Sequence, residues 1–427
     1  MTDKLNILIL HRMGDPRIWR SAVRDIEYSL PDYAPEHHYI VHNAALPLPE
    51  FVKEIDFHAI VLGPTFLCNR HHYALLDKTL KEYQFIKYSK AFKIAMPQDD
   101  YDGSAILEKW LIEWDVDLIY TVCPEHWDVL YPNLANKNKL RMGYTAYISG
   151  AMIERCTTPK PFELRKIDVS YRSKQSYLGS TRYIKGIIGN VFRSNIQKYD
   201  LVLDISTNPK DTIHGDQWLD FVEDSKFVLG SNSGSSLLDP KGVIRFKVNH
   251  YLSSHPGASF EDVKDHCFQR EEGKWTFTAI SPRNIEAALL ETVQILTPGD
   301  YGGVMLPEEH YIPIEPNGSN MKDVEMMMMD KEKIKKIAKT CKETFLSIKE
   351  LRYGFHADEI ISEIYAGIKR KGLSETDTQL MNRYVKKYDQ FKTKELALLW
   401  PTRRFQMNIE RITKSLGKDT LSNMFRW

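Results

Sequence analysis

Short runs of apolar residues recur along the first part of the chain, each about the length of a buried β-strand. They are LNILIL (5–10), HAIVLG (58–63), FKIAMP (92–97), DLIYTV (117–122) and RMGYTAYI (141–148), and amphipathic stretches lie between them. Continuous apolar runs are typical of strands buried on both faces. Their alternation with helices predicts a parallel sheet covered by helices on both sides.

A second series of the same kind follows a linker at residues 156–166, which holds two prolines. Its expected strands are IDVSYR (167–172), YDLVLDIS (199–206), SKFVLGS (225–231) and HYIPI (310–314). The pattern predicts an α/β protein with two Rossmann-like domains in tandem, residues 1–155 and 165–345, and a helical extension over residues 346–427. Two facing domains of this type bind ligands at the carboxyl ends of their strands.

The stretch SPRNIEAALLETVQIL (281–296) predicts one long helix. Ser281 suits the N-cap and Pro282 the first helical position, and Thr-Pro-Gly at 297–299 ends the pattern. The expected buried stripe consists of Ile285, Ala288, Leu289, Thr292, Val293 and Leu296. Arg283 and Glu286 fall outside this stripe, near the amino end.

Two interpretations of Arg283 and Glu286 remain open at this point. They form an ion pair on the helix surface, or they contact a ligand at the helix start. Free N–H groups at a helix start bind phosphate, an arginine adds a positive fork, and a carboxylate accepts two hydrogen bonds from a ribose diol. A nucleotide would satisfy all three groups together.

Further candidates lie where the expected strands end. In the second domain, cationic and hydroxyl side chains suited to a diphosphate or to close backbone approach are Arg172, Lys174, Ser180, Arg182 and Ser235. In the first domain, His11, Asp99 and Asp100 are candidates for catalysis on the acceptor side. Adjacent aspartates point in different directions, and we expect Asp100 rather than Asp99 to face the cleft; a helix-capping acidic turn is the alternative.

Composition narrows the function classes. The 427 residues carry a formal charge of +1, with 42% hydrophobic and 27% charged residues, which argues against a nucleic-acid partner. The five cysteines show no CxxC spacing, and no apolar run approaches the length of a membrane span. We therefore expect a cytoplasmic protein without a bound metal or cofactor.

The order of the motifs YRSKQSYLGS, SKFVLGSNSGSSLLDPKG, ISPRNIEAALLETVQIL and GDYGGVMLPEEHYIPI resembles the carboxyl-terminal half of group-1-like glycosyltransferases with the GT-B fold. Such enzymes occur in bacterial surface polysaccharide assembly, and the resemblance covers residues 165–355. It implies that Glu286, with Arg283 beside it, binds the ribose of a sugar nucleotide. Many retaining relatives have a further glutamate seven residues earlier, where this chain has Thr278.

The resemblance implies transfer of a sugar from a nucleotide-sugar donor to a glycan or lipid-linked acceptor. A sugar-nucleotide epimerase with the same fold and a nucleotide-sugar-binding protein without turnover are the alternatives. The final stretch, residues 401–427, is rich in lysine and arginine with interspersed aromatic residues. It predicts either a packed helical extension or peripheral contact with the inner face of an anionic membrane.

Overall fold

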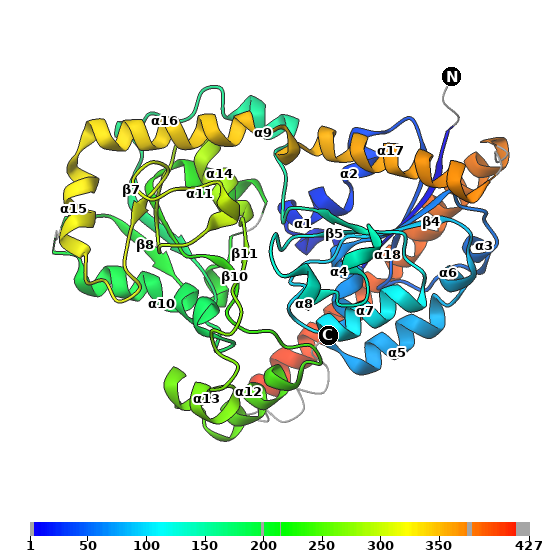
Figure 1. Ribbon diagram of the computed structural model, residues 1–427, viewed down its shortest axis with the longest axis horizontal. Coiled ribbons are helices and arrows are strands. Elements are labelled where there is room, and N and C mark those ends of the chain that lie inside the picture. The colour runs from blue at the N-terminus through cyan, green and yellow to red at the C-terminus, as the bar shows by residue number, and fades with distance from the viewer. Residues whose placement is uncertain (1–3, 198–199, 214, 374–377, 416–427) are drawn as a thin grey trace.

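The computed structural model describes residues 4–197, 200–213, 215–373 and 378–415. Two α/β bodies lie side by side, and long helices run along both (Figure 1). The first body holds a six-stranded parallel sheet in the order β2-β1-β3-β4-β5-β6. Its strands are β1 (Asn6–His11), β2 (His38–Asn43), β3 (Ala59–Leu62), β4 (Phe92–Ala95), β5 (Leu118–Thr121) and β6 (Leu140–Met142).

The second body holds a five-stranded parallel sheet in the order β13-β12-β9-β7-β8, with a separate antiparallel pair, β10 and β11. The strands are β7 (Ile167–Arg172), β8 (Leu203–Ser206), β9 (Ser225–Gly230), β10 (Ser233–Ser235), β11 (Phe277–Ala279), β12 (Val293–Leu296) and β13 (Ile312–Pro313). Two Rossmann-like domains in tandem, predicted from the alternation of strands and helices, are confirmed.

Helices cover both faces of each sheet. The first domain has α1 (Ser21–Glu27), α2 (Ser29–Tyr33), α3 (Glu50–Lys53), α4 (Pro64–Leu67), α5 (Tyr73–Glu82), α6 (Phe85–Tyr88), α7 (Ser104–Glu113), α8 (Trp127–Leu130) and α9 (Gly150–Arg155). The second has α10 (Ser180–Asn195), α11 (Asp216–Glu223), α12 (Val243–Ser254), α13 (Phe260–Cys267), α14 (Pro282–Leu289), α15 (Met321–Met329) and α16 (Lys331–Ser347).

The core follows the two-residue period of each strand. In β1, Leu8 and Leu10 pack into the cluster under α4 and α7, whereas Ile7 and Ile9 pack on the opposite face with α1 and α17 (Tyr353–Lys371). Both sets are fully buried, because a parallel strand has no solvent face. This two-sided burial explains why the expected strands are visible in the sequence as unbroken apolar runs.

The predicted helix over residues 281–296 is wrong in its second half. The helix α14 ends at Leu289, Glu291 adopts a left-handed conformation (φ 52°), and residues 293–296 form strand β12. All four residues of β12 are buried between β9 and β13. Strand pairing on both sides satisfies the backbone there, so the tertiary environment overrides a spacing that also fits a helix.

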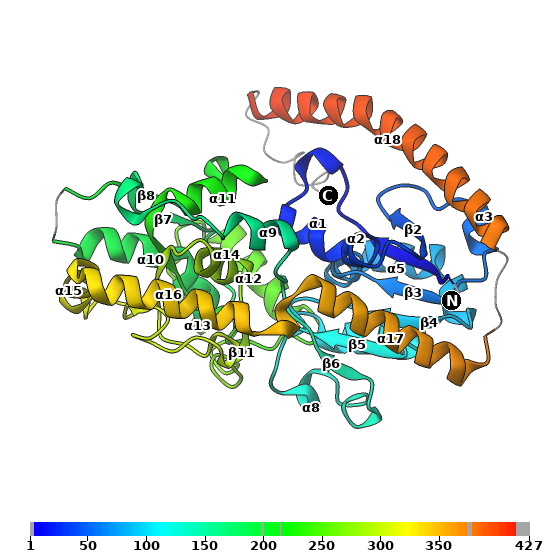
Figure 2. The ribbon, with the colours of Figure 1, turned by 90° about the horizontal axis from the view of Figure 1, so that it is seen from above.

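The carboxyl-terminal helices return to the first domain. Helix α17 (Tyr353–Lys371) crosses from α16 to the first sheet, where the Tyr353 ring stacks on Tyr33 at 5.5 Å. Helix α18 (Thr378–Ser415) lies along β2, and Figure 2 shows it running along the first domain from above. The basic stretch predicted for membrane contact, residues 401–427, lies outside the residues whose side chains are described, so that interpretation stays a prediction.

The two domains meet through the loop that follows β4. Gly103 N donates to Asp239 O at 2.7 Å, and Asp239 N donates to Tyr101 O at 2.9 Å. Residues at the carboxyl ends of the first sheet therefore contact the segment between β10 and α12. Single 3-10 turns lie at Pro16–Ile18, Cys68–His71, Ala135–Lys137, Phe162–Leu164, Pro209–Asp211, Tyr301–Gly303 and Lys349–Leu351.

Candidate nucleotide-sugar site

Buried polar atoms without hydrogen-bond partners gather at the carboxyl ends of the second sheet. Ser173 Oγ follows β7, Ser231 Oγ and Asn232 Oδ1 follow β9, and Arg283 Nε lies at the start of α14. Within the described chain none of them has a partner of good geometry. Leaving such a group unpaired costs about 1–3 kcal/mol, so this concentration of unpaired groups is typical of a ligand site.

Glu286 lies on α14, where a residue of the neighbouring helix α11 binds its carboxyl group. Trp218 Nε1, from α11, donates a hydrogen bond to Glu286 Oε2 at 2.6 Å. Burial raises the pKa of the Glu286 carboxyl, and the negative charge of Asp25, on α1 of the first domain, raises it further.

Arg283 is held in a fixed orientation beside Glu286. Its NH2 group donates to the carbonyl oxygen of Arg172 at 2.7 Å. Its guanidinium lies between the rings of Tyr171, at 5.3 Å, and Trp218, at 5.2 Å. Stacking and one backbone bond orient the guanidinium, while Nε remains without a partner.

Lys185 is a cation of this site that sequence reasoning missed. Its Nζ lies 3.3 Å from Ser233 Oγ. Burial lowers the pKa of Lys185 to about 8, and the positive charges of Arg283 and Arg182 contribute. The signal available in the sequence was the spacing of Arg182 and Lys185, one helical turn apart in RYIKG.

Of the remaining second-domain candidates, Arg172 and Ser235 form hydrogen bonds within their own domain, whereas Lys174 is exposed. The Arg172 guanidinium is used within its own domain, because it binds the Asp204 side chain at 2.7 Å and the Asp211 carbonyl at 3.0 Å. Lys174 is exposed, and Ser235 is buried, where its Oγ accepts from Leu237 N at 3.0 Å. The contacts of Arg172 and Ser235 are those of structural residues.

The amino ends of the two helices near the site differ. Ser180 starts α10, and both its amide, at 3.2 Å, and its hydroxyl, at 2.6 Å, donate to Glu272 Oε1. A carboxylate of the chain itself thus occupies the place that a phosphate could take. At α14, Ser281 N donates to Asn284 Oδ1 at 3.1 Å, so Ser281 and Asn284 define the helix start.

In the first domain, Asp100 is enclosed by the protein, whereas Asp99 is exposed. Asp100 is fully buried, and its Oδ2 accepts from Tyr131 at 2.7 Å and from Thr121 at 2.5 Å. Burial raises the pKa of Asp100. Asp99 is exposed, and its charge acts on the pKa of Lys185. The burial of Asp100 therefore makes Asp99 the more accessible of the two aspartates, against the preference for Asp100 drawn from the sequence.

His11, at the end of β1, is a poor proton acceptor. It is fully buried, its Nδ1 accepts from Met13 N at 3.3 Å, and its Nε2 has no partner among the described residues. Burial, with smaller effects of Lys392 and His42, lowers its pKa to about 3. A neutral histidine of this kind contributes packing against Trp19 and Tyr28 rather than charge.

Thr278, which stands where many retaining relatives have a glutamate, contacts two carboxylates. Its hydroxyl lies 2.7 Å from Glu125 Oε1, in the first domain, and 3.2 Å from Asp300 Oδ2. Carboxylates therefore lie beside this position even though residue 278 itself carries none. Glu125 Oε2 is buried without a partner in the described part of the chain.

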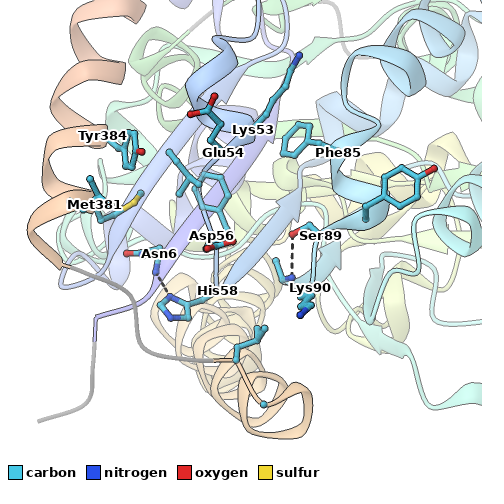
Figure 3. Close-up of a pocket in the computed structure, with 17 residues that line it drawn as sticks. Asn6, Lys53, Glu54, Asp56, His58, Phe85, Ser89, Lys90, Met381 and Tyr384 are labelled. Carbon is cyan, nitrogen blue, oxygen red and sulfur yellow. Dashed lines mark hydrogen bonds between the residues drawn. The ribbon is translucent and has the colours of Figure 1, made fainter.

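A cavity of about 860 Å³ lies elsewhere, at the amino ends of the strands of the first sheet. Figure 3 shows Met381 and Tyr384 of α18 on one side of it and Phe85, Ser89 and Lys90 on the other, with Asp56 and His58 between them. Since Asn6 begins β1, this cavity is at the sheet edge opposite to the one that carries Asp99 and His11. It is separate from the site around Glu286.

The described residues contain no group of three or more histidine, cysteine, aspartate or glutamate side chains that could hold a metal ion. In the same part of the chain, no helix is long and apolar enough to cross a membrane.

Comparison with solved structures identifies the fold. An α-glucosyltransferase in complex with UDP-glucose and DNA containing an abasic site aligns with a TM-score of 0.50 and 10% identity, covering 85% of this chain and 100% of that chain. A glycosyltransferase from Rickettsia africae ESF-5 aligns with a TM-score of 0.45 and 12% identity, covering 86% and 99%. HepE of Anabaena, in complex with UDP-glucose, aligns with a TM-score of 0.45 and 9% identity, covering 84% of this chain and 100% of that chain.

No family model matches the chain, and no curated protein matches its sequence. At identities this low, the likeness to the α-glucosyltransferase concerns the fold. The chain has a GT-B-like architecture of two Rossmann-like domains, as expected from the sequence.

Proposed function

We propose that this protein is a glycosyltransferase that moves a sugar from a nucleotide-sugar donor to a hydroxyl group of a glycan or lipid-linked acceptor. The proposal depends on one observation: Trp218 donates a hydrogen bond to the Glu286 carboxyl and also lies against the Arg283 guanidinium, at the start of α14. A GT-B-like fold, whose ligand cleft lies between the domains, supports the same conclusion.

Each group has a role in donor binding. The Glu286 carboxylate accepts hydrogen bonds from the ribose diol, for which two adjacent hydroxyl donors are well matched. Arg283 and Lys185 neutralise the diphosphate, whose negative charge grows as the glycosidic bond to it breaks. Because these cations are partly desolvated, their attraction to the leaving group is stronger than in water.

In the transfer step, the acceptor oxygen forms a bond to the anomeric carbon. The bond from that carbon to the diphosphate oxygen breaks, and the nucleoside diphosphate leaves with the electron pair. We propose that Asp99 takes the acceptor proton, since it is exposed just after β4 and its charge acts on Lys185. No metal takes part in this proposal.

The setting follows from the resemblance to enzymes of bacterial surface polysaccharide assembly. We propose that the protein acts in the cytoplasm, with its acceptor at the inner face of the membrane and its basic carboxyl-terminal stretch in peripheral contact with anionic lipid. Vesicle sedimentation with and without anionic lipid tests this contact. Equal sedimentation of the full chain and of a variant truncated after residue 400 would contradict it.

Calorimetric titration with UDP, GDP, CMP and dTDP tests the donor site. We expect at least one nucleotide to bind, and Glu286→Gln to weaken its binding about tenfold by removing the charged acceptor. Glu332→Gln, at an exposed glutamate in the first turn of α16, is the matched control. If none of these nucleotides binds, or if both variants behave alike, the proposed site is wrong.

A nucleotide-sugar-binding protein without turnover is the second candidate, and the departure at Thr278 favours it. An incubation experiment separates the transferase from the binding protein. The protein is incubated with a sugar nucleotide that contains the nucleotide found to bind, and free sugar and released nucleoside diphosphate are then measured. Slow donor hydrolysis that is lost in Glu286→Gln supports the transferase. Tight binding with an intact donor after long incubation supports the binding protein.

A further inference from the structure

Asp102 joins the two domains at a point close to the candidate site. It lies in the loop after β4 and is 6% exposed. Two arginines of the second domain reach the same carboxylate oxygen: Arg182 NH2 lies 2.7 Å and Arg245 NH2 lies 2.5 Å from Asp102 Oδ2. The two arginines lower the pKa of Asp102 against the effect of its burial, so the carboxyl group is held ionised.

Backbone contacts fix this carboxylate in place. Asp102 bridges to Asp239 as in a parallel strand pair, and the neighbouring Gly103 N donates to Asp239 O at 2.7 Å. The Asp239 side chain accepts from Arg245 N at 2.9 Å, which orders the start of the helix that carries Arg245. The arrangement exists only while the two domains are in contact.

Arg182 links this contact to the cations of the donor site. It is one helical turn before Lys185 on α10, and its charge lowers the pKa of Lys185. Its guanidinium is oriented on one side by Asp102 and on another by the ring of Tyr101, 5.1 Å away. Two guanidinium groups share the Asp102 carboxylate, and the negative charge of Asp99 also acts on both Arg182 and Lys185.

We infer that Asp102 is a positioning residue, which holds Arg182 against the donor diphosphate without touching the donor itself. The inference rests on the proposed function, because it assigns Arg182 to the diphosphate that Lys185 and Arg283 also contact. A long, flexible arginine side chain loses entropy when it binds phosphate, and a preset orientation reduces this loss.

The same geometry couples domain contact to phosphate binding. When the domains separate, Arg182 loses both Asp102 and Tyr101, and the diphosphate loses an oriented cation. By linkage, a diphosphate that binds the oriented Arg182 stabilises the domain contact to the same extent. A free nucleoside, which carries no phosphate, has no such effect.

The test compares ligands that differ only in phosphate. Dissociation constants of UDP and of uridine, or of whichever diphosphate and nucleoside the wild-type protein binds, are measured for wild type and Asp102→Asn. Asparagine keeps the size of the side chain and removes its charge. We expect the diphosphate to bind about tenfold more weakly and the nucleoside to bind as before. A role in stability alone would change both constants together.

Two further variants make the test specific. Tyr73→Phe removes another contact between the domains, the bond from the Tyr73 hydroxyl to Lys241 O at 2.7 Å, and is expected to leave the ratio of the two constants unchanged. In an Arg182→Gln background, Asp102→Asn should no longer affect diphosphate affinity, because it acts through Arg182. The inference is overturned if the ratio of the diphosphate dissociation constant to the nucleoside dissociation constant is the same or lower in Asp102→Asn than in wild type.

If Asp102→Asn does not fold, Asp102→Glu replaces it. The longer side chain keeps the charge and displaces it, so we expect a smaller loss of diphosphate affinity in the same direction, and an unchanged ratio again overturns the inference. Failure of the proposed function is distinguishable, since the wild-type protein would then bind no nucleotide in a Glu286-dependent way.

Discussion

The indole N–H of Trp218 donates to Glu286 Oε2 at 2.6 Å, so the Glu286 carboxyl on α14 is bound to a second helix, α11. Burial raises the pKa of the Glu286 carboxyl, and the Trp218 hydrogen bond opposes this effect by favouring the ionised form. The hydrogen bond thus orients the carboxyl group and offsets part of the effect of its burial. Trp218 has no role in the sequence patterns, yet the candidate site depends on it.

Trp218→Phe keeps an aromatic ring and removes the donor. We expect nucleotide affinity to fall about fivefold, which corresponds to a loss of about 1 kcal/mol for one hydrogen bond. Trp127→Phe is the matched control, because Trp127 Nε1 also donates one bond at 2.6 Å, to Cys123 O in the first domain. Calorimetric titration of both variants checks the prediction, and equal losses in the two would contradict it.

The reduced pKa of Lys185, about 8, predicts a pH dependence of diphosphate binding. Below this pH the side chain is a cation, and above it the charge is lost, so we expect the affinity for a nucleoside diphosphate to fall as pH rises from 7 to 9.5. Lys185→Arg keeps the positive charge over this whole pH range, so in this variant the affinity should not fall between pH 7 and 9.5. Titrations at half-unit pH intervals measure it, and parallel curves for the two proteins would show that Lys185 does not contact the phosphates.

The sequence predicted the fold better than the site, for physical reasons. Buried parallel strands such as β1 and β9 consist of unbroken apolar residues, so they are visible locally. Residues 293–296 are equally apolar, but whether they form helix or strand depends on β9 and β13, which no local spacing encodes.

Site residues depend even more on distant partners. Arg182 and Ser180 were both predicted as diphosphate ligands from their place in a loop at the end of an expected strand. Their contacts are Asp102 and Glu272, which are 80 and 92 positions away in the chain. Lys185 was overlooked because a lysine within an amphipathic helix has no distinguishing pattern until the fold buries it beside Arg283.

Helix α18 should contribute to the stability of the first domain through Tyr388. The hydroxyl of Tyr388 lies 2.9 Å from His42 Nδ1, and its ring is 2% exposed. We expect Tyr388→Phe to cost about 1 kcal/mol and Tyr388→Ala about 3–5 kcal/mol in the free energy of unfolding. Urea denaturation measures both. A Tyr388→Ala protein as stable as wild type would show that α18 does not pack on β2 in solution.

Buried histidines predict that the protein loses stability in mild acid. Burial lowers the pKa of His356 to about 3, while in the unfolded chain it titrates near its ordinary value of 6.5. Between these values the unfolded state binds a proton that the folded state does not, so the stability present above pH 6.5 is lost progressively as pH falls toward 3. The slope is up to about 1.4 kcal/mol per pH unit for each such histidine.

His356→Phe isolates this effect, because the His356 ring stacks on Tyr147 at 4.2 Å and phenylalanine keeps the stack without the titrating nitrogens. We expect the variant to lose less stability than wild type between pH 6.5 and pH 4, as measured by urea denaturation at each pH. His250→Gln, at an exposed position on α12, serves as the control and should follow the wild-type curve. A His356→Phe curve parallel to wild type would mean that the proton uptake on unfolding comes from other groups, of which His42, also with a pKa of about 3, is the next to replace.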